Sequence, residues 1–123
     1  MKRKSASTND ELINLITRLR KAGRDEGSPI WSDLAHRLSS SRKNRSEVNV
    51  SRINRYSKAG DVIAVAGKLL GSGTIGHGVT VAALSVSSTA RDKITSAGGK
   101  TIGFDELLDS NPKGKNIRVM EGV

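Results

Sequence analysis

The sequence predicts a small α/β domain that begins with two amphipathic helices. Apolar residues in the N-terminal third recur twice with the 3.6-residue period of a helix. The second half instead alternates β-branched runs with helical patterns, which is typical of α/β proteins. The length of 123 residues is that of one domain, long enough to bury one modest core. Since Trp31, Tyr56 and Phe104 are the only aromatic residues, Val, Ile, Leu and Ala must build most of that core.

The first helix is expected to start close to the N-terminus and to end at Gly23. Thr8 and Glu11 have the spacing of a capping box, in which each side chain satisfies a free amide at the helix start. Gly23 follows the last apolar residue of the pattern and is interpreted as the stop signal. The residues with helical periodicity are Leu12, Ile13, Leu15, Ile16 and Leu19.

A second helix is expected to begin at Pro29. Ser28 is in the position of an N-cap, and Pro29 suits the first helical position because its missing N–H has no partner there in any case. Ile30, Leu34 and Leu38 lie on one face of this helix. Both predicted helices are therefore amphipathic, and each must pack against another part of the molecule.

A basic segment separates these helices from the rest of the chain. Residues 39–47 contain no apolar side chain and place Arg42, Lys43 and Arg45 close together. Two interpretations stay open, a solvated surface loop and a phosphate-binding loop. The further cations at Arg52, Arg55 and Lys58 favour phosphate binding.

The second half of the chain predicts an alternation of strands and helices. A Gly-rich connection, residues 71–78, joins the first two strands of this half, and its glycines permit a tight, exposed crossover. Ser88 is expected to cap the helix that follows, and Gly98 and Gly99 to end it. The predicted strands are 61–66, 79–86, 101–102 and 117–120, and the predicted helices are 88–97 and 104–110.

The charge of the chain indicates a polyanionic partner. The formal net charge is +9 and the isoelectric point is about 10.4, a balance typical of nucleic-acid-binding domains, although it also suits anionic membranes. Residues 1–60 carry a net charge of +8 and residues 61–123 a net charge of +1. The absence of cysteine excludes disulfides, zinc ribbons and thiol nucleophiles. No apolar run suits a signal peptide or a membrane helix, so we expect a soluble, intracellular protein.

Several motifs of enzymes are matched only in part. Residues 71–76 read G-x-G-x-x-G, but a dinucleotide site needs a helix directly after this loop, and a strand is predicted there. Gly99-Lys100-Thr101 resembles the end of a phosphate-binding loop, yet Ile94 occupies the position of the required first glycine. The carboxylates of residues 105–109 are interpreted as a solvated acidic helix surface. His36 and His77 are interpreted as helix-surface and loop residues.

Residues 48–58 have the chemistry of an RNA-facing surface. Val48 and Val50 alternate as in a short strand, and Ser51 can cap a brief helix that ends near Gly60. Arg52 and Arg55 are three residues apart and therefore share one helical face, while Ile53 turns toward a core. The guanidinium fork suits phosphate oxygens because it donates two parallel hydrogen bonds. The amides of Asn49 and Asn54 can bind ribose hydroxyls and base edges.

The chain resembles the large-subunit ribosomal protein of the eighteen-e type, in the superfamily that includes bacterial large-subunit protein fifteen. The resemblance extends over almost the whole chain, and the short length is similar to that of archaeal members. It is carried by ELINLITRLRKAG (11–23), by residues 29–73 from PIWSDLAHRL to KLLGSG, by VTVAALSVSSTARDKITSAGG (79–99) and by NPKGKNIRVMEG (111–122).

The resemblance implies a structural role without enzymatic chemistry or a required cofactor. It implies a small α/β body of irregular strand-strand-helix units, residues 47–123, preceded by an RNA-binding region of helices and a basic segment, residues 1–46. The implied partners are large-subunit ribosomal RNA and neighbouring ribosomal proteins, in the cytoplasmic large ribosomal subunit, with no membrane and no small-molecule substrate. The RNA-binding residues expected from resemblance and charge are Lys2, Arg3, Lys4, Arg42, Lys43, Asn44, Arg45, Asn49, Ser51, Arg52, Asn54, Arg55, Lys58, Lys68, Lys113 and Lys115.

Two other functions can be distinguished from the ribosomal role by the motifs that they require. A DNA-binding chromatin or regulatory protein would need a recognition helix with base-reading side chains, and the first two helices offer only a generic pair. A nucleotide-dependent enzyme would rest on the two incomplete phosphate motifs alone. Neither metal ligation nor catalysis is expected.

Overall fold

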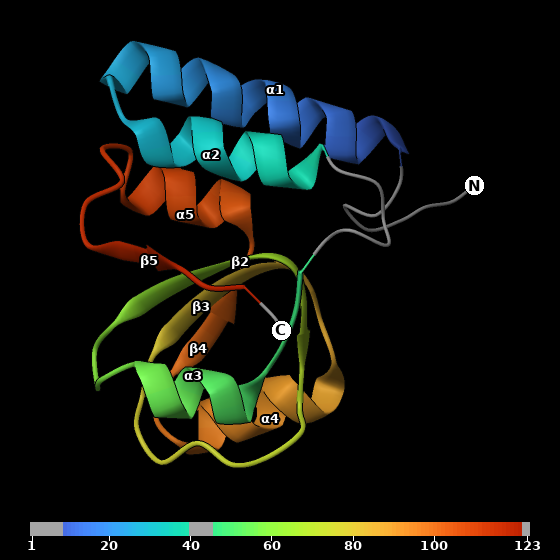
Figure 1. Cartoon of the computed structure of the whole chain (residues 1–123), viewed down its shortest axis with the longest axis vertical. Coiled ribbons are helices and arrows are strands. Elements are labelled where there is room, and N and C mark those ends of the chain that lie inside the picture. Colours follow the sequence, from blue (N-terminus) through green and yellow to red (C-terminus); the bar gives the residue numbers. More distant parts are fainter. Residues whose placement is uncertain (1–8, 40–45, 122–123) are drawn as a thin grey trace.

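A central parallel sheet lies between two layers of helices in the computed structural model, which describes residues 9–39 and 46–121 (Figure 1). Helices lead the chain, and helices and strands then alternate, which confirms the predicted α/β class. In chain order the elements are α1 (Asn9–Glu26), α2 (Pro29–Leu38), β1 (Ser46–Asn49), α3 (Val50–Tyr56), β2 (Val62–Leu70), β3 (Thr80–Val86), α4 (Ser88–Ser96), β4 (Lys100–Ile102), α5 (Phe104–Ser110) and β5 (Ile117–Val119).

The sheet is organised around β2, its longest strand. The strand order is β1-β2-β3-β4, and β5 also pairs with β2, so that β1 and β5 follow one another along the same edge. All of these pairs are parallel. A parallel neighbour requires a crossover, which α3 supplies between β1 and β2 and α4 between β3 and β4. Between β2 and β3 the crossover is the glycine-rich loop, residues 71–78.

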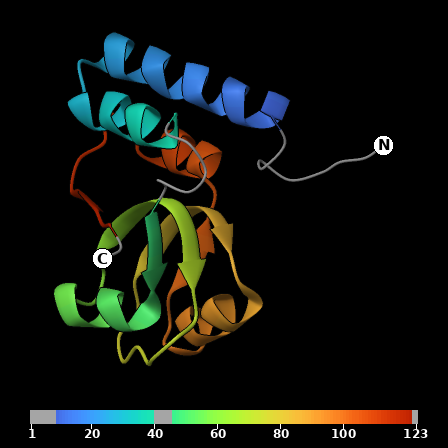
Figure 2. The same cartoon turned by 45° about the vertical axis from the view of Figure 1, so that its right-hand side comes forward.

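Alternating residues of the sheet face two separate hydrophobic cores. Ala64, Ala66 and Ala82 face the first core, which contains α1, α2 and α5. Ile63 and Val65 face the second core together with α3 and α4. Both faces of the sheet are thus covered, as is usual for parallel sheets. Figure 2 shows the same arrangement, with α1, α2 and α5 on one side of the sheet and α3 and α4 on the other.

The expected end of the first helix at Gly23 is wrong, since α1 continues to Glu26. A Cβ atom at residue 23 would lie 2.5 Å from Ser32 Oγ, so the glycine allows α2 to pack closely against α1. Gly27 instead has φ 62°, the left-handed conformation that commonly ends a helix. Gly23 therefore serves the contact between α1 and α2 and does not end α1. Thr8, the predicted capping residue, lies outside the described part of the chain.

Two hydrogen bonds connect the start of α2 to the segment that follows α5. Ser28 occupies the N-cap position as predicted, but its hydroxyl makes no capping bond. It donates instead to the carbonyl oxygen of Lys113 at 2.9 Å. Trp31 is fully buried, and its indole N–H donates to the carbonyl oxygen of Pro112 at 2.8 Å. These two bonds join parts of the chain that are far apart in sequence.

The remaining elements lie close to their predicted bounds. The strand predicted at 61–66 extends to Leu70, and α5 covers residues 104–110 as expected. The helix predicted after the second strand begins at Ser88, but its N-cap is Ser87, whose hydroxyl accepts from the amide of Ala90 at 3.2 Å. The observed cap of α4 thus lies one residue before the predicted one.

Candidate nucleic-acid interface

The short helix α3 presents arginines on one side and apolar residues on the other. Val50 and Ile53 are fully buried in the second core, which confirms the predicted direction of Ile53. Arg55 is exposed and Arg52 is partly exposed. Because the buried side of α3 is held by the core, the backbone that carries the two arginines has a fixed position.

Arg52 has a hydrogen-bond donor without a partner. Its guanidinium carbon lies 5.1 Å from the centre of the Tyr56 ring, within the range of a cation–π contact. Its Nε–H is buried and has no hydrogen-bond partner within the described part of the chain. Such a donor costs about 1–3 kcal/mol when it stays unpaired.

Arg118 adds a cation that the sequence analysis did not include. It extends from β5, and its Nη1 donates to the carbonyl oxygen of Tyr56 at 2.5 Å. Tyr56 is the last residue of α3, where carbonyl groups lack helical partners and the helix dipole favours a positive charge. The alternation of Ile117, Arg118 and Val119 in a strand was the sequence pattern that could have indicated an outward-facing Arg118. We define the α3 basic surface as Arg52, Arg55, Lys58 and Arg118.

The asparagines near α3 have structural roles that the sequence did not predict. Asn49 Oδ1 accepts from the amide of Ser72, and Asn54 Oδ1 accepts from the amide of Gly76, both at 3.0 Å. Ser51 was expected to cap the helix, but the N-cap is Asn49, and the exposed Ser51 lies in the first turn. The oxygens of both asparagines therefore hold the glycine-rich loop, while their amide N–H groups stay available to a ligand.

The other predicted RNA-binding residues are not gathered at α3. Lys68 is exposed on β2, opposite Glu47 of β1. Lys113 and Lys115 are exposed in the turn beside α2, where Asn111 Nδ2 donates to the carbonyl oxygen of Lys115 at 2.8 Å. The expected residues that lie outside the described ranges are Lys2, Arg3, Lys4, Arg42, Lys43, Asn44 and Arg45.

Three cations of the helical layer, Arg18, Lys21 and Arg37, are paired with carboxylates. Arg18 Nη1 lies 2.5 Å from Asp105 Oδ1, and Nη2 lies 2.6 Å from Asp109 Oδ1. The hydrogen bond that Arg18 donates to Asp105, followed by the one that it donates to Asp109, raises the pKa of Arg18. The acidic helix surface predicted at 105–109 is therefore exposed but engaged by Arg18.

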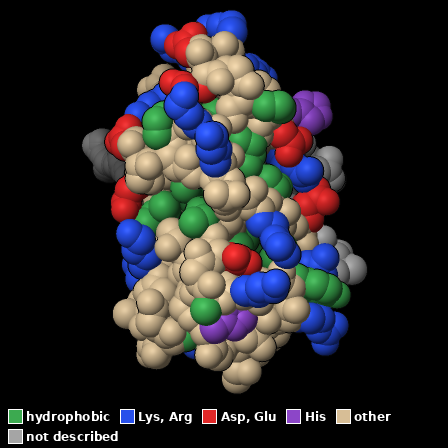
Figure 3. Space-filling model, turned by 90° about the vertical axis from the view of Figure 1, so that its left-hand side faces the viewer, with side chains coloured by type: hydrophobic (Ala, Val, Ile, Leu, Met, Phe, Trp, Pro, Cys, Tyr) green, Lys and Arg blue, Asp and Glu red, His purple; other side chains and the backbone are tan. Residues whose placement is uncertain are grey.

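Two further cations of this layer are paired in the same way. Lys21 pairs with Asp25 at 2.7 Å, and its hydrogen bond lowers the pKa of that carboxyl group. Arg37 pairs with Asp33 at 3.0 Å and also with Glu121. No ion pair between described residues involves a member of the α3 basic surface. Figure 3 shows acidic side chains concentrated over the upper, helical half of one face, with basic side chains continuing over the lower half.

His77 lies in the glycine-rich loop and joins that loop to α3. Its Nε2 atom is 2.9 Å from Ser57 Oγ. The Ser57 hydroxyl donates to the carbonyl oxygen of Ile53 at 2.5 Å, so its proton is already committed and the imidazole must be the donor to Oγ. In this arrangement His77 cannot act as the base that would activate Ser57 as a nucleophile.

The secondary structure around the two incomplete phosphate motifs is the one that the sequence predicted. Strand β3, not a helix, follows the glycine-rich loop, and Lys100 and Thr101 lie in β4 after the buried Ile94 of α4. No group of three or more His, Cys, Asp or Glu side chains that could hold a metal ion occurs among the described residues. Within the same residues, no helix has the length and apolar character needed to cross a bilayer.

Comparison with known proteins identifies the family. The family model described as ribosomal protein 60S L18 and 50S L18e matches residues 1–123. The large ribosomal subunit protein eL18 of Methanospirillum hungatei is 49% identical over 120 residues, which cover 98% of this chain and 99% of the relative. The eL18 proteins of Methanothermobacter thermautotrophicus and Methanococcus maripaludis are 48% and 42% identical, and the matches cover 98% and 96% of this chain and 100% and 98% of the relatives. With this agreement along its whole length, the chain belongs to the family of ribosomal proteins 60S L18 and 50S L18e.

Proposed function

We propose that this protein is a structural constituent of the large ribosomal subunit that binds and stabilises large-subunit ribosomal RNA, beside neighbouring ribosomal proteins. In this proposal it acts without catalysis and without a cofactor. The family supports the ribosomal assignment, and no comparison favours the DNA-binding alternative. The observation that carries the RNA-binding role is the α3 basic surface, which takes part in no ion pair among the described residues and whose helix is held by the buried Val50 and Ile53.

The proposed binding is electrostatic and geometric. Each arginine or lysine that neutralises a phosphate releases condensed counterions, which makes the affinity fall as salt is added. Duplex RNA exposes its wide minor groove with 2′-hydroxyls and backbone, so side chains there recognise shape more than sequence. The partly exposed guanidinium of Arg52 suits phosphate or hydroxyl oxygens, and its neighbour Tyr56 is 49% exposed.

The RNA-binding residues of this proposal fall into two groups. The first group is the α3 basic surface with Asn49, Ser51 and Asn54. The second group is the basic segment, which directly precedes β1 in the chain. Its members are Arg42, Lys43, Asn44 and Arg45. We infer weaker contributions from the cations near the N-terminus, on β2 and in the turn beside α2.

Sedimentation of a cell lysate through sucrose at low and at high salt tests the assignment. We expect the protein to migrate with the large subunit in both, because many phosphate contacts made together withstand moderate salt. Purified protein should also bind protein-free large-subunit RNA in dilute buffer. A protein that stays at the top of both gradients and ignores structured RNA would contradict the proposal.

A further inference from the structure

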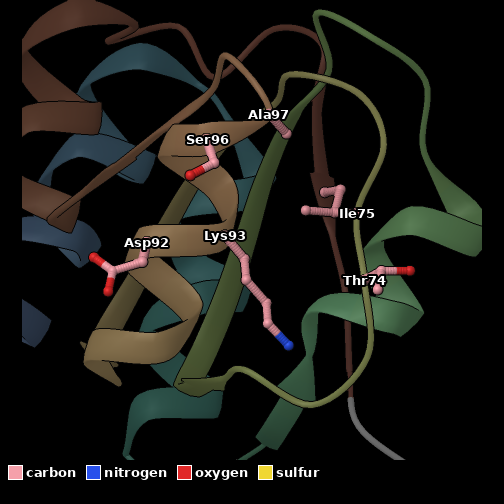
Figure 4. Close-up of a pocket in the computed structure, with 6 residues that line it drawn as sticks. All are labelled: Thr74, Ile75, Asp92, Lys93, Ser96 and Ala97. Carbon is pink, nitrogen blue, oxygen red and sulfur yellow. The ribbon is translucent and has the colours of Figure 1, made fainter.

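Lys93 is a partly buried basic residue whose ammonium group contacts the backbone of the glycine-rich loop. It extends from α4 toward the glycine-rich loop, along a shallow hollow lined by Thr74, Ile75 and Ser96 (Figure 4). Its Nζ atom donates to the carbonyl oxygen of Gly71 at 2.6 Å and to that of Gly73 at 2.5 Å. Two of the three ammonium hydrogens are therefore engaged by the loop backbone.

The residue between these two carbonyl groups caps α3. The amide of Ser72 donates to Asn49 Oδ1 at 3.0 Å, and its carbonyl oxygen accepts from the amide of Ser51 at 3.2 Å. The amide of Ser51 is one of the four at the start of α3 that have no partner within the helix. Since the Asn49 side chain makes no capping bond, the loop supplies the cap.

Steric contact holds the same part of the loop against α3. A Cβ atom at residue 73 would lie 2.3 Å from Ser51 Cβ, and Gly73 has φ 93°. At the start of the loop, a Cβ atom at residue 71 would lie 2.7 Å from Thr89 Cβ of α4. The loop is wedged between α3 and α4, and Lys93 holds it from the α4 side.

We propose that Lys93 is a positioning residue for RNA binding. Its ammonium group holds residues 71–73 in place, these residues cap α3, and α3 in turn places Arg52 and Arg55 on the α3 basic surface. Its positive charge serves the carbonyl groups of the loop and does not neutralise an RNA phosphate. This inference rests on the proposed function.

The test compares Lys93→Met with Lys93→Arg and Arg55→Gln in binding to protein-free large-subunit RNA. We expect Lys93→Met to weaken binding about tenfold, equal to about 1.4 kcal/mol, without changing the slope of log affinity against log salt concentration. Amide hydrogen exchange of residues 71–78 should become faster in this variant. Lys93→Arg should restore both properties, because a guanidinium can also donate to two carbonyl oxygens. Arg55→Gln should instead lower the slope and leave loop exchange unchanged.

Arg91→Gln is the matched control, because Arg91 is exposed on the same helix and loses the same charge. Loop exchange should be the same as in the unmodified protein. The positioning role is overturned if Lys93→Met lowers the salt slope as Arg55→Gln does while loop exchange stays slow, since Lys93 would then contact phosphate directly. It is equally overturned if loop exchange accelerates and affinity does not change. Unmodified protein that fails to bind the RNA would contradict the proposed function. The exchange data would still show whether Lys93 holds residues 71–73 in place.

Discussion

Gly73 shows how much of the interface depends on a residue without a side chain. Gly73 is held on two sides. Its carbonyl oxygen accepts a hydrogen bond from Lys93, and its backbone lies close to Ser51. Its φ of 93° is disfavoured for any residue with a Cβ atom. Its place in the incomplete dinucleotide motif therefore has a structural explanation, namely close packing of the loop on α3.

Gly73→Ala should destabilise the protein by about 1–3 kcal/mol, the usual cost of a strained backbone, and the clash with Ser51 should displace the loop. Chemical denaturation measures the free energy of unfolding. Gly76→Ala is the matched control in the same loop, because a Cβ atom there meets nothing within 4 Å and φ is not positive. Equal stability of the two variants would show that the contact with Ser51 does not constrain the loop.

At the scale of elements, patterns that depend on near neighbours were predictable and contacts between distant segments were not. The bounds of α5 follow from Phe104 and the acidic first turn together with Asn111-Pro112 at its end. The stop at Gly23 failed because the reason for that glycine is Ser32, on another helix. Sequence spacing gives no information on such packing.

The same distinction applies to the candidate site. Arg52 and Arg55 share a helical face, so their common surface was evident from spacing alone. Arg118 joins them only because β5 pairs with β2, beside β1, a topology that short motifs do not reveal. Lys93 could not be separated from surface lysines by sequence, since its partners are backbone oxygens of the loop.

The basic segment and α3 make separable contributions to the proposed binding. Replacing Arg42, Lys43 and Arg45 together with Ala should weaken RNA binding and reduce the magnitude of the salt slope by about 2, at about 0.7 for each phosphate contact of single-stranded character. The fold should be unaffected, because this segment has no apolar residue that a core could need. Affinity measured at several salt concentrations, with circular dichroism of each variant, checks both statements. An unchanged affinity and slope would remove the segment from the site.

For the whole molecule, the position of a cation matters more than the net charge. Arg18, Lys21 and Arg37 all belong to the layer of α1 and α2, and each is paired with carboxylates. Exposed pairs of this kind contribute about 0.2–1 kcal/mol each to stability. Between the residues that the structure describes, no such pair involves the α3 basic surface on the opposite side of the sheet. Charge pairing on α1 and α2 therefore offsets the charge of Arg18, Lys21 and Arg37, which makes these three cations less attractive to phosphate.

The two layers share one sheet, and this predicts that they unfold together. The proposed division at residue 46 stays a prediction about the organisation of the sequence, but the first core joins α1 and α2 to Ala64 and Ala82 of the sheet. The second core lies on the other face of the same strands. A loss of packing on either face of the sheet should therefore lower the free energy of unfolding of the whole chain.

Trp31, the single tryptophan, is a built-in probe of the helical layer, because its fully buried ring lies in the first core. Ile94→Ala removes a fully buried side chain from the second core and should cost about 2–5 kcal/mol. We expect this change to shift the unfolding transition of Trp31 fluorescence as far as that of far-ultraviolet circular dichroism, with the two curves coincident in both proteins. If the fluorescence transition stays in place while the dichroism transition moves, the N-terminal helices unfold as a separate unit and the sheet does not couple the two cores.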